Sequence, residues 1–227
     1  MTPDELLEMD LSVGGGDWKP TPHGEHLASV LAHQNLVADQ EVLELGGGVA
    51  NHTIILLRQG PTKLVTTEIT KERLRTTRTN VEHNCGVDPR IEYRVANWLD
   101  TEGRFDVVIS NPPFAKSGKQ NRRYFIDRLI LDAHHRLRRG GLLVFVQSSM
   151  ADIAKSWRRL EENGYEPRRL GETEGPFRDY YFEDQTFMEE IQTVPDGFEV
   201  RDGTYYETLV VLGSRLRPWK PPAGADL

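Results

Sequence analysis

The chain has 227 residues, a hydrophobic fraction of 37% and a formal net charge of −7, values typical of one globular domain. No stretch approaches the roughly 18 apolar residues that a membrane span needs, and the first residues lack the order of a signal peptide. The single cysteine, Cys85, excludes an internal disulfide framework and a cysteine-rich zinc site, and no spacing of acidic residues and histidines predicts another metal site. We therefore expect a cytoplasmic protein with no membrane partner, as a monomer or a homodimer.

The negative charge is concentrated in two segments. Residues 1–17 contain five acidic residues and no lysine or arginine, and residues 172–190 contain seven acidic residues and one arginine. The rest of the chain is therefore mildly basic. A negative net charge disfavours binding to the phosphate backbone of nucleic acid. Because only these two segments carry the negative charge, the argument against an RNA substrate depends on where they lie.

Apolar periodicity predicts alternating strands and helices from about residue 24 onward. The predicted helices cover residues 25–33, 51–57, 70–84, 123–137 and 151–163, and the predicted strands cover residues 41–45, 63–68, 91–95, 105–109, 142–147, 166–170 and 204–212. Gly140-Gly141 is expected to end the fourth helix. The alternation predicts an α/β fold with a mostly parallel sheet and helices on both faces.

A glycine turn follows the first predicted strand. Gly46 and Gly48 carry no side chains, so the backbone can approach a ligand there, and the next helix begins with unpaired N–H groups. Glu68 ends the following strand, about 20 residues further on, where a carboxylate accepts hydrogen bonds from both ribose hydroxyls of an adenine nucleoside. These features predict a nucleoside cofactor and leave a dinucleotide and S-adenosylmethionine open.

Asn111-Pro112-Pro113-Phe114 follows the fourth predicted strand, at the sheet edge where ligands bind in open α/β folds. The prolines stiffen the backbone and hold the Asn111 oxygen and nearby carbonyls as acceptors for a planar –NH2 group. Acceptors that pull the N–H bonds out of plane localise the nitrogen lone pair and stabilise the positive charge that develops. Phe114 can stack on the attached planar group.

Taken together, Glu44 through Gly48, Glu68 and the loop 111–114 resemble class I S-adenosylmethionine-dependent methyltransferases of the amino-methylating branch, over residues 18–150. That branch includes release-factor glutamine methyltransferases, guanine-N2 and adenine-N6 nucleic-acid methyltransferases and small-molecule N-methyltransferases. The resemblance implies a Rossmann-like sheet of seven strands, one of them antiparallel near the edge. It also implies S-adenosyl-L-methionine as cofactor and S-adenosyl-L-homocysteine as product.

The resemblance further implies roles for single residues. Asn111 and Pro112 would position the nitrogen and Phe114 would stack on it. The implied cofactor contacts are Thr21, Glu44, Gly46, Gly48, Glu68, Asn97, Trp98 and Asn111. Asn97 stands where the family usually has an aspartate. Trp98 covers the adenine or belongs to the core, and Thr21 binds the cofactor carboxylate or caps the following helix.

Residues 24–216 are expected to form the methyltransferase domain, with one segment before it, one after it and one inserted within it. Residues 1–23 are expected to close over the cofactor, residues 217–227 to form a flexible tail, and residues 171–196 to form a lid over the carboxyl ends of the strands. The expected substrate contacts are Pro113, Phe114, Phe177, Tyr180, Tyr181 and Glu183. A satellite core or a dimer face is the alternative interpretation of the aromatic residues in the lid segment.

We expect methyl transfer to a planar amino, amide or guanidino nitrogen, preferably of a small molecule in biosynthesis. The chain offers no clear helical substrate domain and no basic accessory domain, and aromatic and acidic residues suit a small planar or cationic substrate. A protein glutamine or an RNA base is the alternative acceptor. An NAD-dependent oxidoreductase is disfavoured, because no Tyr-x-x-x-Lys pair occurs and hydride transfer gives the loop 111–114 no role. A non-catalytic protein that retains a cofactor-shaped cleft is a further alternative.

Overall fold

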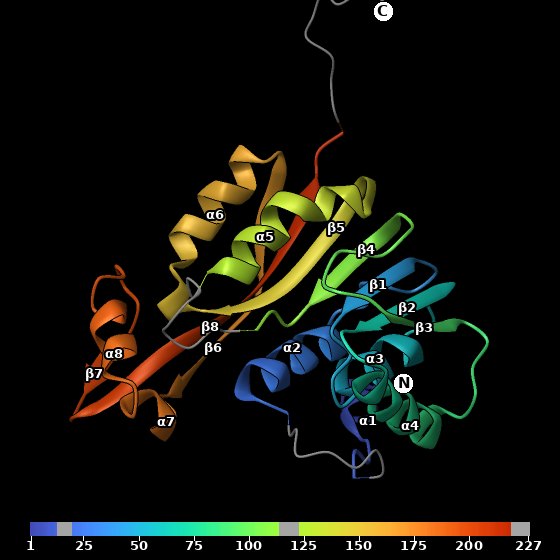
Figure 1. Cartoon of the computed structure of the whole chain (residues 1–227), viewed down its shortest axis with the longest axis horizontal. Helices are drawn as coiled ribbons and strands as arrows, with labels where there is room; N and C mark the ends of the chain where they lie inside the picture. The colour runs from blue at the N-terminus through green and yellow to red at the C-terminus, as the bar shows by residue number, and fades with distance from the viewer. Residues whose placement is uncertain (13–19, 114–122, 219–227) are drawn as a thin grey trace, which may run out of the picture.

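A computed structural model describes residues 1–12, 20–113 and 123–218 (Figure 1). The helices are α1 (Pro3–Leu7), α2 (Pro22–His33), α3 (Asn51–Arg58), α4 (Lys71–Cys85), α5 (Tyr124–Asp132), α6 (Ile153–Glu162), α7 (Asp179–Phe182) and α8 (Gln185–Ile191). The strands are β1 (Glu41–Leu45), β2 (Lys63–Glu68), β3 (Ile91–Val95), β4 (Phe105–Ser110), β5 (Leu137–Ser148), β6 (Tyr165–Pro176), β7 (Glu199–Arg201) and β8 (Thr204–Leu216).

The strands form one mixed sheet in the order β3-β2-β1-β4-β5-β8-β6. Strands β1 to β5 pair in parallel, and β8 pairs antiparallel with both β5 and β6. This path of seven strands, with its reversed strand next to the edge, confirms the predicted fold class. The three-residue β7 pairs with β8 as an addition that the apolar pattern did not reveal.

Helices cover both faces of the sheet because alternate residues of each strand point to opposite sides (Figure 1). Val42 of β1 packs in a first core cluster with α1, α2, α3 and α4. Its neighbour Leu43 packs in a second core cluster with α5 and α6. The largely buried strands β1 and β4 therefore carry apolar residues on both faces, as expected for the centre of a parallel sheet.

The prediction that Gly140-Gly141 ends a helix is wrong. Helix α5 ends at Asp132, a single 3-10 turn follows, and both glycines lie inside β5. The pairing of β5 with β4 shifts register between Phe105 and Val107, so residues 138–141 bulge. Arg138, within the bulge, forms ion pairs with Asp106 at 2.8 Å and with Glu41 at 2.9 Å. These partners come from other strands, which a local helix pattern cannot reveal.

The segment 171–196, which the sequence analysis expects to form a lid, begins as sheet, because β6 extends to Pro176. Strands β6 and β8 remain paired beyond the end of β5, out to Pro176 opposite Tyr206. We call residues 173–208 the arm. It carries α7, α8 and β7 and extends past the carboxyl ends of the parallel strands (Figure 1). Its buried residues Phe177, Tyr181, Phe187 and Ile191 form a third core cluster with Met150, which follows β5.

Candidate functional site

The predicted cofactor residues are brought to one edge of the sheet. The glycine turn follows β1, Glu68 ends β2, Asn97 follows β3 and Asn111 follows β4. Because these four strands are parallel neighbours, the residues after them share the carboxyl edge.

The glycine turn is open on one side. Gly46 and Gly48 have φ angles of +81° and +55°, which L side chains rarely adopt, and a Cβ at either would meet no atom within 4 Å among the described residues. The Gly48 N–H donates to Glu68 Oε1 at 2.8 Å, so the acid stands directly against the turn. Open space beside backbone, next to a carboxylate, is the arrangement expected of a nucleoside site.

Glu44 lies beneath this turn and is 1% exposed. Thr53 donates its hydroxyl hydrogen to Glu44 Oε2 at 2.6 Å, whereas Oε1 is buried and accepts no hydrogen bond from the described residues. Burial raises the pKa of Glu44 to about 7, against the hydrogen bond from Thr53. The turn therefore rests on a buried carboxyl group with an unused acceptor.

Three polar side chains from three elements surround Gly24 in the first turn of α2. A Cβ at Gly24 would lie 3.4 Å from Asn111 Nδ2 and 3.6 Å from both Asn51 Nδ2 and Thr21 Oγ1. Thr21 caps α2, since its hydroxyl oxygen accepts the Gly24 N–H at 3.2 Å. Asn51, which the sequence analysis gives only as the start of a predicted helix, is the first residue of α3, and Ala50 is the cap. The glycine pattern before Asn51 was the available signal that it lies at the site.

His52 fixes the position of Gly24. Its Nε2 lies 2.8 Å from the Gly24 carbonyl oxygen, which can only accept, so Nε2 carries the hydrogen. Burial lowers the pKa of His52 to about 4, and the ring is neutral at pH 7. The start of α3 thereby holds the start of α2 beside Asn111.

Asn97 and Trp98 differ in their surroundings. Asn97 is exposed, and Trp98 adopts a φ of +54°. The Trp98 ring packs against the second core cluster, with its centre 5.3 Å from that of Phe125 in an edge-to-face contact. Trp98 thus contributes to the core, while its contact with adenine stays a prediction.

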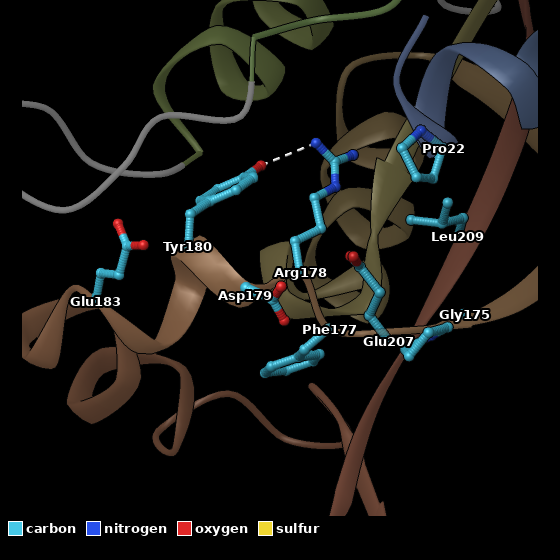
Figure 2. Close-up of a pocket in the computed structure, with 10 residues that line it drawn as sticks. Pro22, Gly175, Phe177, Arg178, Asp179, Tyr180, Glu183, Glu207 and Leu209 are labelled. Carbon is cyan, nitrogen blue, oxygen red and sulfur yellow. Dashed lines mark hydrogen bonds between the residues drawn. The ribbon is translucent and has the colours of Figure 1, made fainter.

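The predicted substrate residues lie in different environments. Pro112 is buried, Pro113 is exposed, and Phe114 falls outside the described residues. Phe177 and Tyr181 are buried in the third core cluster. Tyr180 and Glu183, with one side of Phe177, line a cavity of about 600 Å³ between the arm and the first turn of α2 (Figure 2).

Three residues that the sequence analysis did not select meet at this cavity. Arg178 donates from Nη1 to the Tyr180 hydroxyl at 2.8 Å and from Nη2 to His23 Nδ1 at 2.9 Å. Burial, reinforced by the charge of Arg178, lowers the pKa of His23 to about 3, which leaves a neutral acceptor. Glu207 of β8 is 2% exposed and completes the group. A lone glutamate within an aromatic and apolar strand was the signal that could have found it.

Within residues 1–12, 20–113 and 123–218, no group of three or more metal-binding side chains is present. No helix in these same ranges is both long and apolar enough to cross a membrane.

Comparison with known proteins identifies the family. The model of the methyltransferase small domain matches residues 24–165, which is more than half of the chain. A protein of Methanocaldococcus jannaschii, provisionally named a protein N5-glutamine methyltransferase, is 25% identical over 169 residues, 66% of this chain and 84% of that protein. A release factor glutamine methyltransferase of Agrobacterium fabrum is 29% identical over 120 residues, 50% of this chain but only 41% of that protein.

Solved structures share the fold. A Pyrococcus horikoshii protein, provisionally described as an RNA methyltransferase, aligns with a TM-score of 0.61 at 16% identity, over 95% of this chain and 96% of that chain. The T. thermophilus 16S rRNA N2 G1207 methyltransferase, solved with AdoMet and guanosine, aligns with a TM-score of 0.56 at 21% identity, over 89% of this chain and 45% of that chain.

The cofactor of this family fits the residues that the structure gathers. Gly46 and Gly48 leave open space beside the turn, Glu68 stands against it, and Glu44 Oε1 is a buried oxygen without a hydrogen bond from the described residues. An amino acid joined to an adenosine offers hydrogen-bond donors for such carboxylates. With the match over residues 24–165, the chain belongs to the methyltransferase small domain family and is an S-adenosylmethionine-dependent methyltransferase.

Proposed function

We propose that this enzyme methylates the side-chain amide nitrogen of a glutamine in a protein. The observation that carries the proposal is the position of Asn111, after β4 and beside the first turn of α2. Its Nδ2 lies 3.4 Å from the position that a Cβ at Gly24 would occupy, and its Oδ1 is the hydrogen-bond acceptor of the amide. The names of the M. jannaschii and A. fabrum relatives support a glutamine acceptor over the small molecule that the sequence alone favoured.

The chain's own groups would act on the acceptor nitrogen by hydrogen bonding. Asn111 Oδ1 and the Pro112 carbonyl would accept its two N–H bonds and turn the lone pair away from the amide plane. An amide nitrogen is a poor nucleophile in its planar form, so fixed acceptors lower the barrier by orientation and by stabilising the developing charge. S-adenosylmethionine, when bound, supplies a methyl group on a positively charged sulfur. The nitrogen loses one proton after transfer, so no strong base is required.

Charge favours a protein over an RNA acceptor. Asp179, Glu183 and Glu207 line the cavity beside α2, with Arg178 as the cation among the described lining residues. Carboxylates at the entrance to a site repel a phosphate backbone. RNA therefore remains the second outcome of the experiment below.

The experiment incubates the purified enzyme with labelled S-adenosylmethionine and separated protein, RNA and small-molecule fractions of a cell extract. We expect label in protein, with N5-methylglutamine identified by mass spectrometry of the digested peptides. Label confined to RNA or to small molecules would contradict the glutamine proposal.

Replacement of Asn111 tests the mechanism on whichever fraction accepts the label. Asn111→Ala should lower kcat/KM by about 100-fold or more, because one fixed hydrogen-bonding group contributes on the order of that factor. Affinity for S-adenosylhomocysteine, measured by calorimetry, should fall far less than kcat/KM, because Asn111 is only one of the cofactor contacts that the resemblance implies. Asn163→Ala, at the exposed end of α6, is the matched control. Full activity in Asn111→Ala would remove the basis of the mechanism.

A further inference from the structure

The cavity between the arm and α2 adjoins the site around Asn111. Pro22, the first residue of α2, forms part of its wall, and Gly24 lies two residues further along the same turn and faces Asn111. Phe177 and Leu209 supply apolar surface (Figure 2). A group seated in this cavity would therefore be attached within a short distance of the proposed acceptor nitrogen.

Glu207 is a buried acid with unused hydrogen-bonding capacity. Tyr181 donates its hydroxyl hydrogen to Glu207 Oε1 at 3.4 Å, whereas Oε2 is buried and accepts no hydrogen bond from the described residues. Burial raises the pKa of Glu207, whereas the Ser148 hydroxyl and the charge of Arg178 act in the opposite direction. The nearby His23 Nε2, 3.9 Å from Oε2, belongs to a ring that is neutral at pH 7 and does not balance the carboxylate charge.

The positively charged guanidinium of Arg178 lies over aromatic rings beside the cavity. The guanidinium carbon of Arg178 lies 5.6 Å from the centre of the Tyr180 ring and 5.9 Å from that of Tyr181. Figure 2 shows the Glu207 carboxylate directed from β8 toward the side chain of Arg178. Aromatic faces stabilise positive charge, so this wall suits a cation better than an anion.

Among the described residues that line the cavity, the negative charges outnumber the one positive charge of Arg178. Asp179 and Glu183 are exposed at its rim, and neither forms an ion pair with any described residue. In the described part of the lining, three carboxylates therefore share one guanidinium. An uncompensated negative charge that is partly withdrawn from water is stabilised strongly by a partner cation.

We propose that this cavity binds a positively charged side chain of the methyl acceptor, a lysine or arginine close in sequence to the methylated glutamine. The proposal rests on the proposed function for the identity of the acceptor, and on the cavity alone for the binding of a cation. It assigns Glu207, Glu183 and Asp179 as residues that determine which acceptor is bound.

Binding is tested with a matched pair of probes, N-acetyl-arginine amide and its neutral isostere N-acetyl-citrulline amide, titrated into the enzyme saturated with S-adenosylhomocysteine. We expect the arginine probe to bind about tenfold or more tightly, which is the effect of one desolvated cation–π or carboxylate contact. Equal affinities, or no binding of the arginine probe, would overturn the proposal.

Variants locate the probe. Asp179→Asn combined with Glu183→Gln should weaken the arginine probe about fivefold to tenfold, and Glu207→Gln should also weaken it. The control combines Asp196→Asn with Glu189→Gln, which removes the same charge from exposed arm positions outside the cavity. An equal loss of affinity for the arginine probe in the control would mean that only the net negative charge of the arm attracts the probe, which would contradict the proposal.

A second measurement separates this proposal from the proposed function. Glutamine peptides that differ only in arginine or citrulline beside the glutamine are compared as acceptors. Equal methylation of both peptides contradicts the cation site and supports the glutamine function. Tight binding of the arginine probe without methylation of any glutamine peptide supports the cation site and contradicts the glutamine function.

Discussion

Gly47, between the two glycines that face open space, is the most tightly packed residue of the turn. A Cβ there would lie 2.5 Å from Thr66 Oγ1 and 2.6 Å from Thr77 Cγ2. Thr77 cannot simply rotate away, because its hydroxyl donates to the Gly48 carbonyl at 2.7 Å. We expect Gly47→Ala to lower the free energy of unfolding by about 1–3 kcal/mol, as measured by urea denaturation, and to weaken S-adenosylhomocysteine binding.

Gly175→Ala is the control, because a Cβ at that position meets nothing within 4 Å and the backbone needs no positive φ. Its stability should stay within about 0.5 kcal/mol of the wild type. A Gly47→Ala protein of unchanged stability would show that the turn relaxes freely. The sequence predicted the open side of this turn from Gly46 and Gly48. It could not predict the packed side, which is made by Thr66 of β2 and Thr77 of α4.

At the scale of elements, the site depends on how α3 holds α2. His52 donates to the Gly24 carbonyl, and burial lowers its pKa to about 4 from an ordinary value of 6.5. Below pH 6.5 the unfolded chain binds a proton at this residue that the folded chain resists, so stability falls as the pH falls. From pH 7.5 to 5 this residue should remove about 2 kcal/mol from the free energy of unfolding.

His52→Gln keeps an N–H donor and removes the titration, so urea denaturation should show a pH dependence weaker by about that 2 kcal/mol over the same range. His23 also has a lowered pKa, so it lowers the free energy of unfolding at low pH in the wild type and in His52→Gln alike. The difference in pH dependence between the two proteins therefore reports on His52. His134→Gln, at an exposed position beyond α5, is the matched control. An unchanged pH dependence in His52→Gln would mean that His52 has the same pKa in the folded and in the unfolded protein.

Elements were predictable where a local pattern decides them. The strands β1 and β2 and the helix α4 follow from apolar runs and glycine stops, and their bounds agree closely with the structure. Gly140-Gly141 was misleading because Arg138 reaches Asp106 and Glu41, partners far away in the chain. The convergence of Thr21, Asn51 and Asn111 around Gly24 could not be predicted from local sequence patterns either, because these residues are far apart in the chain.

At the scale of the whole molecule, the arm has a core of its own. The third core cluster gathers residues of α7, α8 and the turn after β5, separate from the two clusters that flank the sheet. The predicted cofactor residues that follow β1 to β4 lie at the sheet, whereas the cavity proposed for the acceptor is lined mainly by the arm. Cofactor binding and acceptor binding should therefore be separable by mutation.

Phe187 is the residue with which to separate them. It is 2% exposed, and its ring stacks on Tyr181 with centres 5.0 Å apart. Phe187→Ala removes about 3–5 kcal/mol of packing from a small cluster, which should open the arm before the sheet. We expect faster amide hydrogen exchange in residues 177–198, S-adenosylhomocysteine affinity within about twofold of the wild type, and loss of acceptor methylation.

Phe182→Ala, at a ring that is 48% exposed, provides the comparison and should leave exchange in the arm nearly unchanged. If Phe187→Ala instead unfolds the sheet and the arm together and abolishes S-adenosylhomocysteine binding, the two behave as one cooperative unit. The contacts between Arg178 and His23 would then couple α2 and the arm strongly enough to make acceptor and cofactor binding interdependent. If the arm alone opens, the family's cofactor site works on the sheet by itself, and the arm determines which acceptor reaches it.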